Sequence, residues 1–136
     1  MLNKNFKVSK QYFQYVKRGS GTRLLKSDSL EKPYQDILDN EILANFPNKE
    51  QIDVFAYSQC NDIEIIVKLP ILLLEKGTYY LTEAWFKYLI DKDKGIVYSS
   101  CSALRMSGLS LKPYAKSTLM RFHKYYNEWL DQQKMS

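Results

Sequence analysis

The sequence contains a single histidine and only two cysteines in 136 residues, which limits the chemistry that the chain can carry. A metal site with several histidines is excluded, and the short paired spacings that mark structural zinc are absent. A zinc site of Cys60, Cys101, His123 and a carboxylate, or a cysteine nucleophile with His123 as base, is a weak alternative, because nothing local marks either thiol as activated. We therefore expect no metal, no cofactor and no catalysis, and we expect His123 on a helix surface.

Long hydrophobic runs are also missing. The longest apolar stretch, Leu69 to Leu74, falls far short of the roughly 18 residues that a membrane-spanning helix needs. Lysines near the N-terminus resemble the start of a signal peptide, but Ser9, Lys10 and Gln11 stand where such a peptide requires an apolar stretch. These absences predict a cytoplasmic protein without membrane contact, whose two thiols are free and reduced.

Three stretches match ligand-binding or catalytic motifs only in part. Gly19 to Thr22 lacks the further glycine and the lysine of a phosphate-binding loop, and Asp91 to Gly95 lacks the later acidic ligands of a calcium loop. Glu64 and Lys68 share one face of a predicted strand, as an acid and a lysine of a nuclease would, but Ile66 lies between them. We interpret these stretches as a flexible connection, a turn and the solvent side of a half-buried strand, with a hydrolase as a weak alternative.

Apolar and aromatic residues are plentiful, at 45% and 14% of the chain, and eleven of the residues are tyrosines. They suffice to fill one core without disulfides or metal, so residues 1–136 are expected to form a single domain. Lysine, asparagine, isoleucine and tyrosine are common whereas alanine, glycine and proline are few, as AT-rich coding DNA produces. Small accessory proteins of mobile elements often have this composition.

Three segments have helical spacing. Ser9 can cap a short helix that runs to about Arg18, and a second helix covers Leu30 to Asn45. The third and clearest begins at a Ser110 cap with Pro113 in its first turn, and it is expected to pack on the sheet. Its apolar face is formed by Leu111, Ala115, Thr118, Phe122, Tyr125, Tyr126 and Trp129.

Between the second and third helices the apolar period changes to two. Ile52 to Tyr57 and Ile63 to Leu69 are predicted to form a hairpin. Pro70 interrupts pairing, so the residues after it form either an edge strand or a continuation in a new direction. A turn at Lys76 and Gly77 then leads into another strand.

Thr82 to Ile90 fits two structures. It is apolar nearly all round as a helix, which we slightly favour, and as a strand it would pair through a turn at Asp91 to Gly95 with Ile96 to Ala103. In either case the sequence predicts an α+β fold, an antiparallel sheet with N-terminal helices and a long C-terminal helix packed on it.

Charge along the chain is segregated by sign. Met1 to Lys26 contain seven basic residues and no acid, Ser27 to Ala56 contain seven acids and two lysines, and the last forty residues are basic again. The net charge of +5 favours polyanionic partners, although a lysine-rich composition from AT-rich DNA produces it as well.

The basic ends predict contact with DNA or RNA. On the C-terminal helix a stripe of basic residues could follow a phosphate backbone, and the N-terminal residues would extend it if the two ends meet. The candidate contacts are Lys10, Lys17, Arg18, Arg23, Lys112, Lys116, His123 and Lys134. Four arginines are too few for extensive base reading, so we expect backbone contacts. Tyr12, Tyr15, Tyr125 or Tyr126 would stack on unpaired bases, unless these rings belong to the core.

The acidic middle of the chain predicts a different function. One side of the Leu30 to Asn45 helix carries Glu31, Asp36, Asp39 and Glu41, which would steer a basic protein partner or imitate nucleic acid. The alternative prediction is therefore a protein-interaction module, an inhibitor or adaptor that binds a larger enzyme or assembly. Opposite charges on separate faces also suit association into a homo-oligomer.

Overall fold

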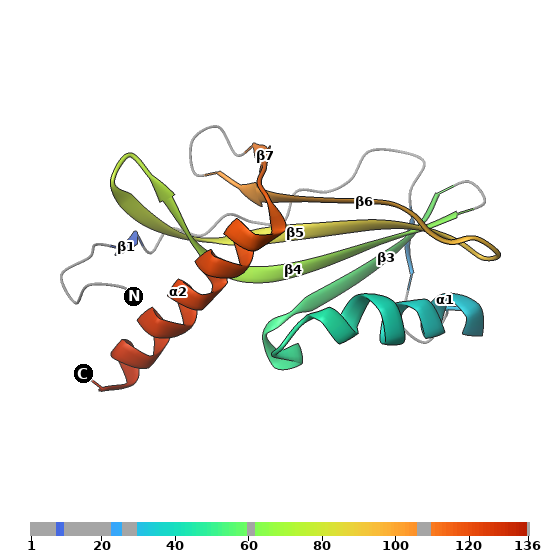
Figure 1. Ribbon diagram of the computed structural model, residues 1–136, viewed down its shortest axis with the longest axis horizontal. Helices are drawn as coiled ribbons and strands as arrows, with labels where there is room; N and C mark the ends of the chain where they lie inside the picture. The colour runs from blue at the N-terminus through green and yellow to red at the C-terminus, as the bar shows by residue number, and fades with distance from the viewer. Residues whose placement is uncertain (1–7, 10–22, 26–29, 60–61, 106–109, 136) are drawn as a thin grey trace. The chain divides into compact units, whose positions relative to one another are not determined.

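The computed structural model describes residues 8–9, 23–25, 30–59, 62–105 and 110–135. The strands in this part of the chain are β1 (Val8–Ser9), β2 (Arg23–Leu25), β3 (Asp53–Gln59), β4 (Asp62–Glu75), β5 (Thr78–Asp91), β6 (Gly95–Leu104) and β7 (Leu111–Pro113). The α-helices are α1 (Lys32–Ile37) and the long C-terminal α2 (Lys116–Met135) (Figure 1). The predicted α+β fold, an antiparallel sheet with a long C-terminal helix, is confirmed.

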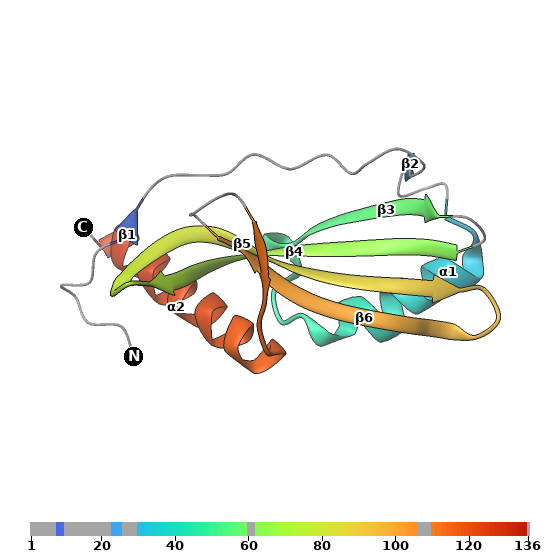
Figure 2. The ribbon, with the colours of Figure 1, turned by 90° about the horizontal axis from the view of Figure 1, so that it is seen from above.

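The strands follow the order β2-β3-β4-β5-β6-β7 in one sheet, and β1 pairs in parallel with β5 (Figure 2). The predicted hairpin is confirmed, because β3 and β4 pair antiparallel from Asp53 opposite Lys68 to Gln59 opposite Asp62. β4 continues through Pro70 to Glu75. Proline is tolerated there because it lies beyond the last β4 residue that pairs with β3.

The slight preference for a helix at Thr82 to Ile90 is wrong, because these residues belong to strand β5. Ala84, Trp85, Phe86 and Ile90 are all buried, so apolar residues occupy both faces of the strand. In a strand that is covered on both faces, apolar and polar residues do not alternate, so its sequence cannot be distinguished from that of a buried helix.

The predicted turn at Asp91 to Gly95 is present, and one side chain closes it. Asp91 Oδ1 accepts backbone hydrogen bonds from Asp93 at 2.8 Å and from Lys94 at 2.9 Å. The hydrogen bond from Lys94, followed by that from Asp93, lowers the pKa of the Asp91 carboxyl below its ordinary value. Gly95 then takes a φ of 82°, a conformation that favours glycine.

The interpretation of Glu64 and Lys68 as the solvent side of a half-buried strand is wrong. Their exposed fractions are 8% and 4%, and Ile65, Ile66 and Val67 between them are fully buried. The Lys68 ammonium lies 4.9 Å from the centroid of the Phe55 ring on β3. Both faces of this part of β4 are therefore covered, which local alternation could not reveal.

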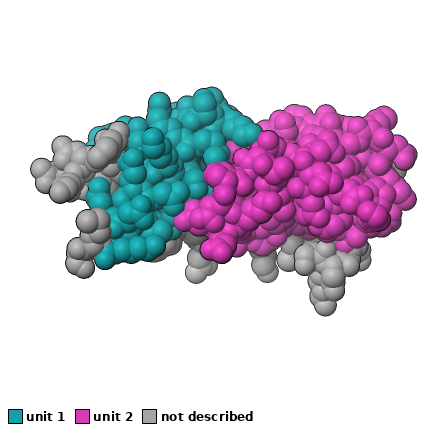
Figure 3. All heavy atoms as spheres, turned by 60° about the horizontal axis from the view of Figure 1, so that its bottom comes forward, with its two compact units in different colours: residues 1–15, 69–85, 101–136 teal, residues 16–68, 86–100 magenta. Residues whose placement is uncertain are grey.

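The chain divides into two compact units (Figure 3). Unit 1 contains residues 1–15, 69–85 and 101–136, and unit 2 contains residues 16–68 and 86–100. β4, β5 and β6 each contribute residues to both units. The expectation of a single domain stays a prediction.

In unit 2 the predicted Leu30 to Asn45 helix is present as three consecutive helical stretches. α1 has a proline in its first turn and is followed by a π-helical turn (Leu38–Ile42) and a 3₁₀ turn (Leu43–Asn45). The segment ends at Phe46, whose backbone is extended before Pro47. Its buried side is formed by Tyr34, Ile37, Leu38 and Ile42.

In unit 1 the C-terminal helix begins later than predicted. Leu111–Pro113 form β7, and α2 starts at Lys116, so Ser110 does not cap it. Pro113 is suited to this short outer strand, since proline lacks the N–H of a central ladder. Ser9 likewise lies in β1 and does not cap a helix, whereas the remainder of that predicted helix lies outside the described residues.

The predicted apolar face packs on the sheet in unit 1 except for Leu111, which lies in β7, and Ala115, which precedes α2 and is exposed. Leu119 and Phe122 are buried, and the half-buried Tyr125, Tyr126 and Trp129 lie against a cluster that contains Leu72 and Leu81. The Tyr79 and Tyr125 rings meet edge to face, with centroids 5.9 Å apart.

Candidate nucleic-acid interface

The predicted basic stripe on the C-terminal helix does not form as a single helical row. Lys112 lies in β7 and Lys116 opens α2. His123 lies on α2 but is only 3% exposed, so its expected place on the helix surface is wrong. Lys134 is exposed near the other end of α2, about 27 Å along the axis from Lys116 at 1.5 Å per residue.

His123 has a structural role. Its Nδ1 lies 2.8 Å from the Pro70 carbonyl oxygen and its Nε2 lies 3.1 Å from Asn127 Nδ2. These partners assign the neutral tautomer, in which Nδ1–H donates to the carbonyl and Nε2 accepts from the amide. Burial lowers the pKa of His123, and the backbone hydrogen bond to Pro70 opposes that shift in part. The imidazole therefore joins α2 to β4 and does not supply a positive charge.

The N-terminal candidates are placed only in part. Lys10, Lys17 and Arg18, together with the stacking candidates Tyr12 and Tyr15, lie outside the described residues. Arg23 lies in β2, where it pairs with Ser58 of β3 in unit 2. The convergence of the two basic ends therefore stays a prediction.

A set of exposed cations does lie on β7 and the first half of α2, all within unit 1. We call Lys112, Lys116, Arg121 and Lys124 the basic face, and all four are exposed. Arg121 and Lys124 were absent from the predicted set. The signal for them was in the sequence, because residues 106–127 contain no aspartate or glutamate.

The charges of the basic face are not compensated. In the described part of the chain none of the four forms an ion pair. Lys112 Nζ lies 5.5 Å from the Tyr114 ring centroid, and the Arg121 guanidinium lies 5.6 Å from that of Phe122. Rings next to these two cations orient them without neutralising them.

Tyr125 and Tyr126 contribute to packing. Tyr126 stacks on His123 with 6.2 Å between ring centroids. The ring centroid of Tyr125 lies 6.3 Å from that of Phe122, and the same ring contacts Tyr79. Both rings are half-buried and pack against the cluster that contains Leu72 and Leu81, so they are poor candidates for stacking on unpaired bases.

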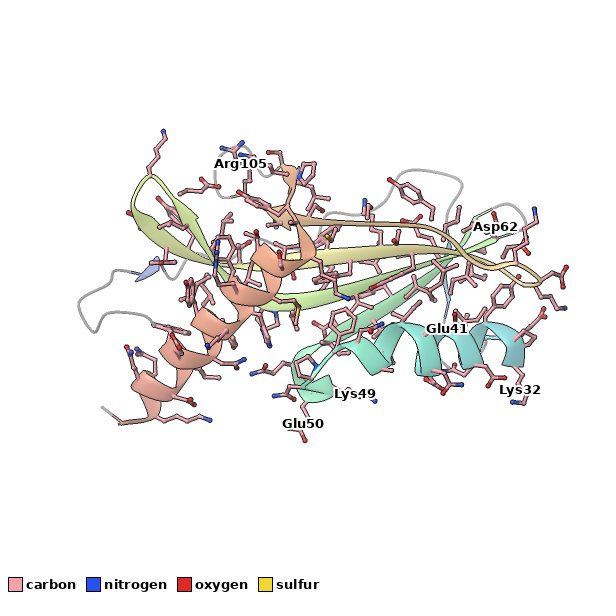
Figure 4. All side chains as sticks on the ribbon, in the orientation of Figure 1. Lys32, Glu41, Lys49, Glu50, Asp62 and Arg105 are labelled. Carbon is pink, nitrogen blue, oxygen red and sulfur yellow. The ribbon has the colours of Figure 1, made fainter. Side chains whose placement is uncertain are left out.

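The four acidic candidates lie in unit 2. Glu31, Asp36, Asp39 and Glu41, which we call the acidic face, are all exposed. Two of these carboxylates are paired, Glu31 with Lys92 at 3.0 Å and Asp36 with Lys32 at 3.1 Å. Figure 4 shows Lys32 at the end of α1, on the side that points away from the strands. The acidic face is therefore partly neutralised, unlike the basic face.

Cys101 is held as a protonated thiol. Its Sγ donates to the Tyr114 carbonyl oxygen at 3.2 Å, and burial raises its pKa. Cys60, its candidate partner in a zinc site, lies outside the described residues. Among the residues that are described, no group of three His, Cys, Asp or Glu side chains is arranged to hold a metal ion.

No helix in the described ranges has both the length and the apolar character to cross a membrane. Comparisons of the chain with protein-family models, curated protein sequences and solved structures find no match.

Proposed function

We propose that this protein is a non-catalytic accessory protein that binds DNA or RNA through its basic face, mainly by phosphate contacts. The observation that supports the proposal is the group of four exposed, unpaired cations on β7 and α2, in a stretch of sequence without acids. A surface of this kind releases counterions when it meets a polyanion, which drives association.

The position of these charges on the helix favours a ligand over a stabilising role. The first turn of α2 contains no acid, and Lys116 stands at its start. A cation near a helix N-terminus opposes the helix dipole, at a cost of about 0.3–1 kcal/mol. A bound phosphate would offset this cost, because its negative charge attracts both the Lys116 ammonium and the N–H groups at the start of the helix.

The spacing on α2 suits a nucleic-acid backbone. Lys116 and Lys124 are eight residues apart, or about 12 Å along the axis, which spans roughly three to four phosphates of one strand in projection. Three of the four cations are lysines, which act as point charges and seldom read base edges. We therefore expect binding with little dependence on base sequence.

The salt dependence of binding tests the proposal. For the double variant Arg121→Gln, Lys124→Gln we expect the slope of log affinity against log salt to decrease by about 2 on duplex DNA, or slightly less on single strands. Each lost phosphate contact removes about 0.9 from the slope on duplex DNA. Fluorescence anisotropy with labelled duplex and single-stranded oligonucleotides, between low and moderate salt, measures both slopes.

A matched control is Lys92→Gln, which removes one exposed cation from unit 2, outside the basic face. It should leave the slope unchanged. A loss in the control of about half that in the double variant would show that only net charge matters, since the control removes one charge and the double variant removes two. No binding of the wild-type protein in dilute buffer would refute the proposal.

A second candidate function, a protein-interaction module, rests on the acidic face. All four of its carboxylates are exposed, although the same segment buries Tyr34, Ile37, Leu38 and Ile42. Asp39 and Glu41 are the two members without an ion pair in the described residues. They would attract a basic partner most strongly.

The double variant Asp39→Lys, Glu41→Lys separates the two candidates. If the second holds, this reversal should abolish recovery of a partner with the tagged protein after nuclease treatment of the native cell extract. The basic-face variant should then recover that partner as the wild type does. A partner that is lost on nuclease treatment, or that both variants retain, would count against the second candidate.

A further inference from the structure

Strand β6 has an open edge in unit 2. The strand is bonded to β5 on one side, and on its other side β7 pairs only with Ser102 to Leu104. The Cys101 carbonyl oxygen also accepts a hydrogen bond from Tyr114 N–H on that side, at 3.5 Å. Within the described residues, Gly95 to Ser100 therefore have no strand partner there. In Figure 2, β6 lies at the outer side of the row formed by β3, β4 and β5. We call this segment the β6 edge.

The β6 edge lacks the features that keep exposed strands from pairing. No charged residue and no proline occurs from Gly95 to Leu104. Open edges of stable proteins are ordinarily guarded by lysine, proline, an inward charge, a bulge or a very short strand. The β6 edge also contains Ile96, Val97 and Tyr98, residue types that favour pairing.

The other open strand segments in the described part of the chain are guarded. In β3, Asp53 is exposed in the part of the strand that does not pair with β2. β7 contains Lys112 and Pro113, two residue types that guard an open edge. In β4, Pro70 lies in the part of the strand that does not pair with β3. The carbonyl oxygen of this proline accepts a hydrogen bond from His123. β1 and β2 are only two and three residues long. The β6 edge is the exception among them.

Exposure of apolar surface is highest at the middle of the same edge. Tyr98 is 61% exposed and Val97 is 46% exposed, more than the other exposed large hydrophobic residues, Leu74 and Val54. Tyr98 also lies near the middle of Gly95 to Ser100. A two-fold axis at this residue would pair Ile96 to Ser100 of one copy with the same residues of the other, which is all of the open segment except Gly95.

We infer that the β6 edge is a self-association surface, on which the β6 strands of two copies pair antiparallel about a two-fold axis at Tyr98. This register sets Tyr98 opposite the Tyr98 of the second copy, and Val97 opposite Ser99. The segment has no charge to repel its copy, and an aromatic pair at the centre stabilises antiparallel strands. Such an isologous contact closes as a dimer without further growth.

The contact is a short strand pair, so the dimer belongs to the class of small, weak interfaces. It is independent of the proposed binding of nucleic acid, since it involves no residue of the basic face. A foreign strand could add to the same edge, but the most exposed ring lies near the middle of the segment, where a two-fold axis brings the rings of two copies together, and this favours self-pairing.

Analytical ultracentrifugation from about 5 to about 500 µM tests for the dimer, a range that covers micromolar dissociation constants. We expect a concentration-dependent dimer, which Tyr98→Lys weakens by about tenfold or more because like charges then face each other. Leu74→Lys is the matched control, since it adds the same charge at a similarly exposed apolar residue of β4 and should leave the dimer unchanged. A wild-type protein that stays monomeric, or a dimer that Tyr98→Lys leaves intact, would overturn the inference.

Disulfide trapping tests the register itself. Directly opposed residues of antiparallel strands have Cα atoms about 4.5–5.5 Å apart, within the range that a disulfide bridges. Tyr98→Cys should therefore cross-link under mild oxidation, whereas the wild type and Lys94→Cys, in the turn before β6, should not. Cross-linking of Lys94→Cys as efficiently as Tyr98→Cys would contradict the two-fold axis at residue 98.

Discussion

Replacing Phe46 by alanine is expected to lower the free energy of unfolding by about 3–5 kcal/mol, the cost of removing a buried phenyl group and leaving a cavity. Phe46 is 3% exposed, and its ring meets that of Phe86 edge to face with 5.1 Å between centroids. This contact attaches the end of the helical segment to β5 within unit 2. Urea denaturation followed by tryptophan fluorescence and circular dichroism measures the change.

The contribution of the ring pair can be separated from simple loss of volume. Phe46→Leu keeps much of the side chain and should cost less than about 1.5 kcal/mol. A double-mutant cycle of Phe46→Ala with Phe86→Ala should show a coupling of about 0.5–1.5 kcal/mol, as measured for aromatic pairs. Strict additivity of the two losses would show that the rings do not contact each other in solution.

Replacing His123 by alanine should cost about 2–4 kcal/mol, because packing is lost and the Pro70 carbonyl loses its donor. The imidazole is 3% exposed and bonded at both nitrogens. His123→Gln is the matched control, since its amide can donate to Pro70 and accept from Asn127. It should retain much of the stability, as urea denaturation at pH 7.5 would show.

His123 should also make stability depend on pH. Burial lowers its pKa in the folded chain below the ordinary value of 6.5. As the pH falls through 6.5, the unfolded chain takes up a proton that the folded chain resists, so the unfolded state is favoured. This stability is therefore complete above pH 6.5 and is lost on acidification until the pH passes the folded pKa.

The comparison with His123→Gln isolates this effect from the carboxylates. Between pH 7.5 and pH 5.5 the wild type should lose more free energy of unfolding than His123→Gln does, because glutamine does not titrate. Identical pH dependence of the two proteins would mean that His123 is solvated and titrates as an ordinary histidine.

Several elements could be predicted from local residue patterns. Pro33 and Phe46-Pro47 delimit the helical segment, and Asp91 to Gly95 form a turn, because these residue types restrict their own backbone or bind adjacent N–H groups. The β3–β4 hairpin and the apolar face of α2 were likewise visible as periods in the sequence. The exposure of Asp36 likewise followed from the helical period, whereas Glu31 precedes α1, and Asp39 and Glu41 lie in the π-helical turn.

Other features depended on neighbours that are distant in the chain. Thr82 to Ile90 is a strand because it pairs with β4 on one side and with β6 on the other. Leu111–Pro113 is a strand because it pairs with the end of β6. Residue order alone could not place His123 against a carbonyl 53 positions away, nor bury Glu64 and Lys68. The basic face was missed in part because the predicted stripe was aligned with Lys112 and His123, of which the first lies in β7 and the second is buried.

Local sterics and hydrogen bonds act between residues a few positions apart, so turns, hairpins and amphipathic faces can be predicted from the sequence. Burial and strand partnership are properties of surfaces that meet only after the chain has folded. The tertiary structure therefore decided which polar groups are enclosed, which cations remain unpaired, and which strand keeps an open edge.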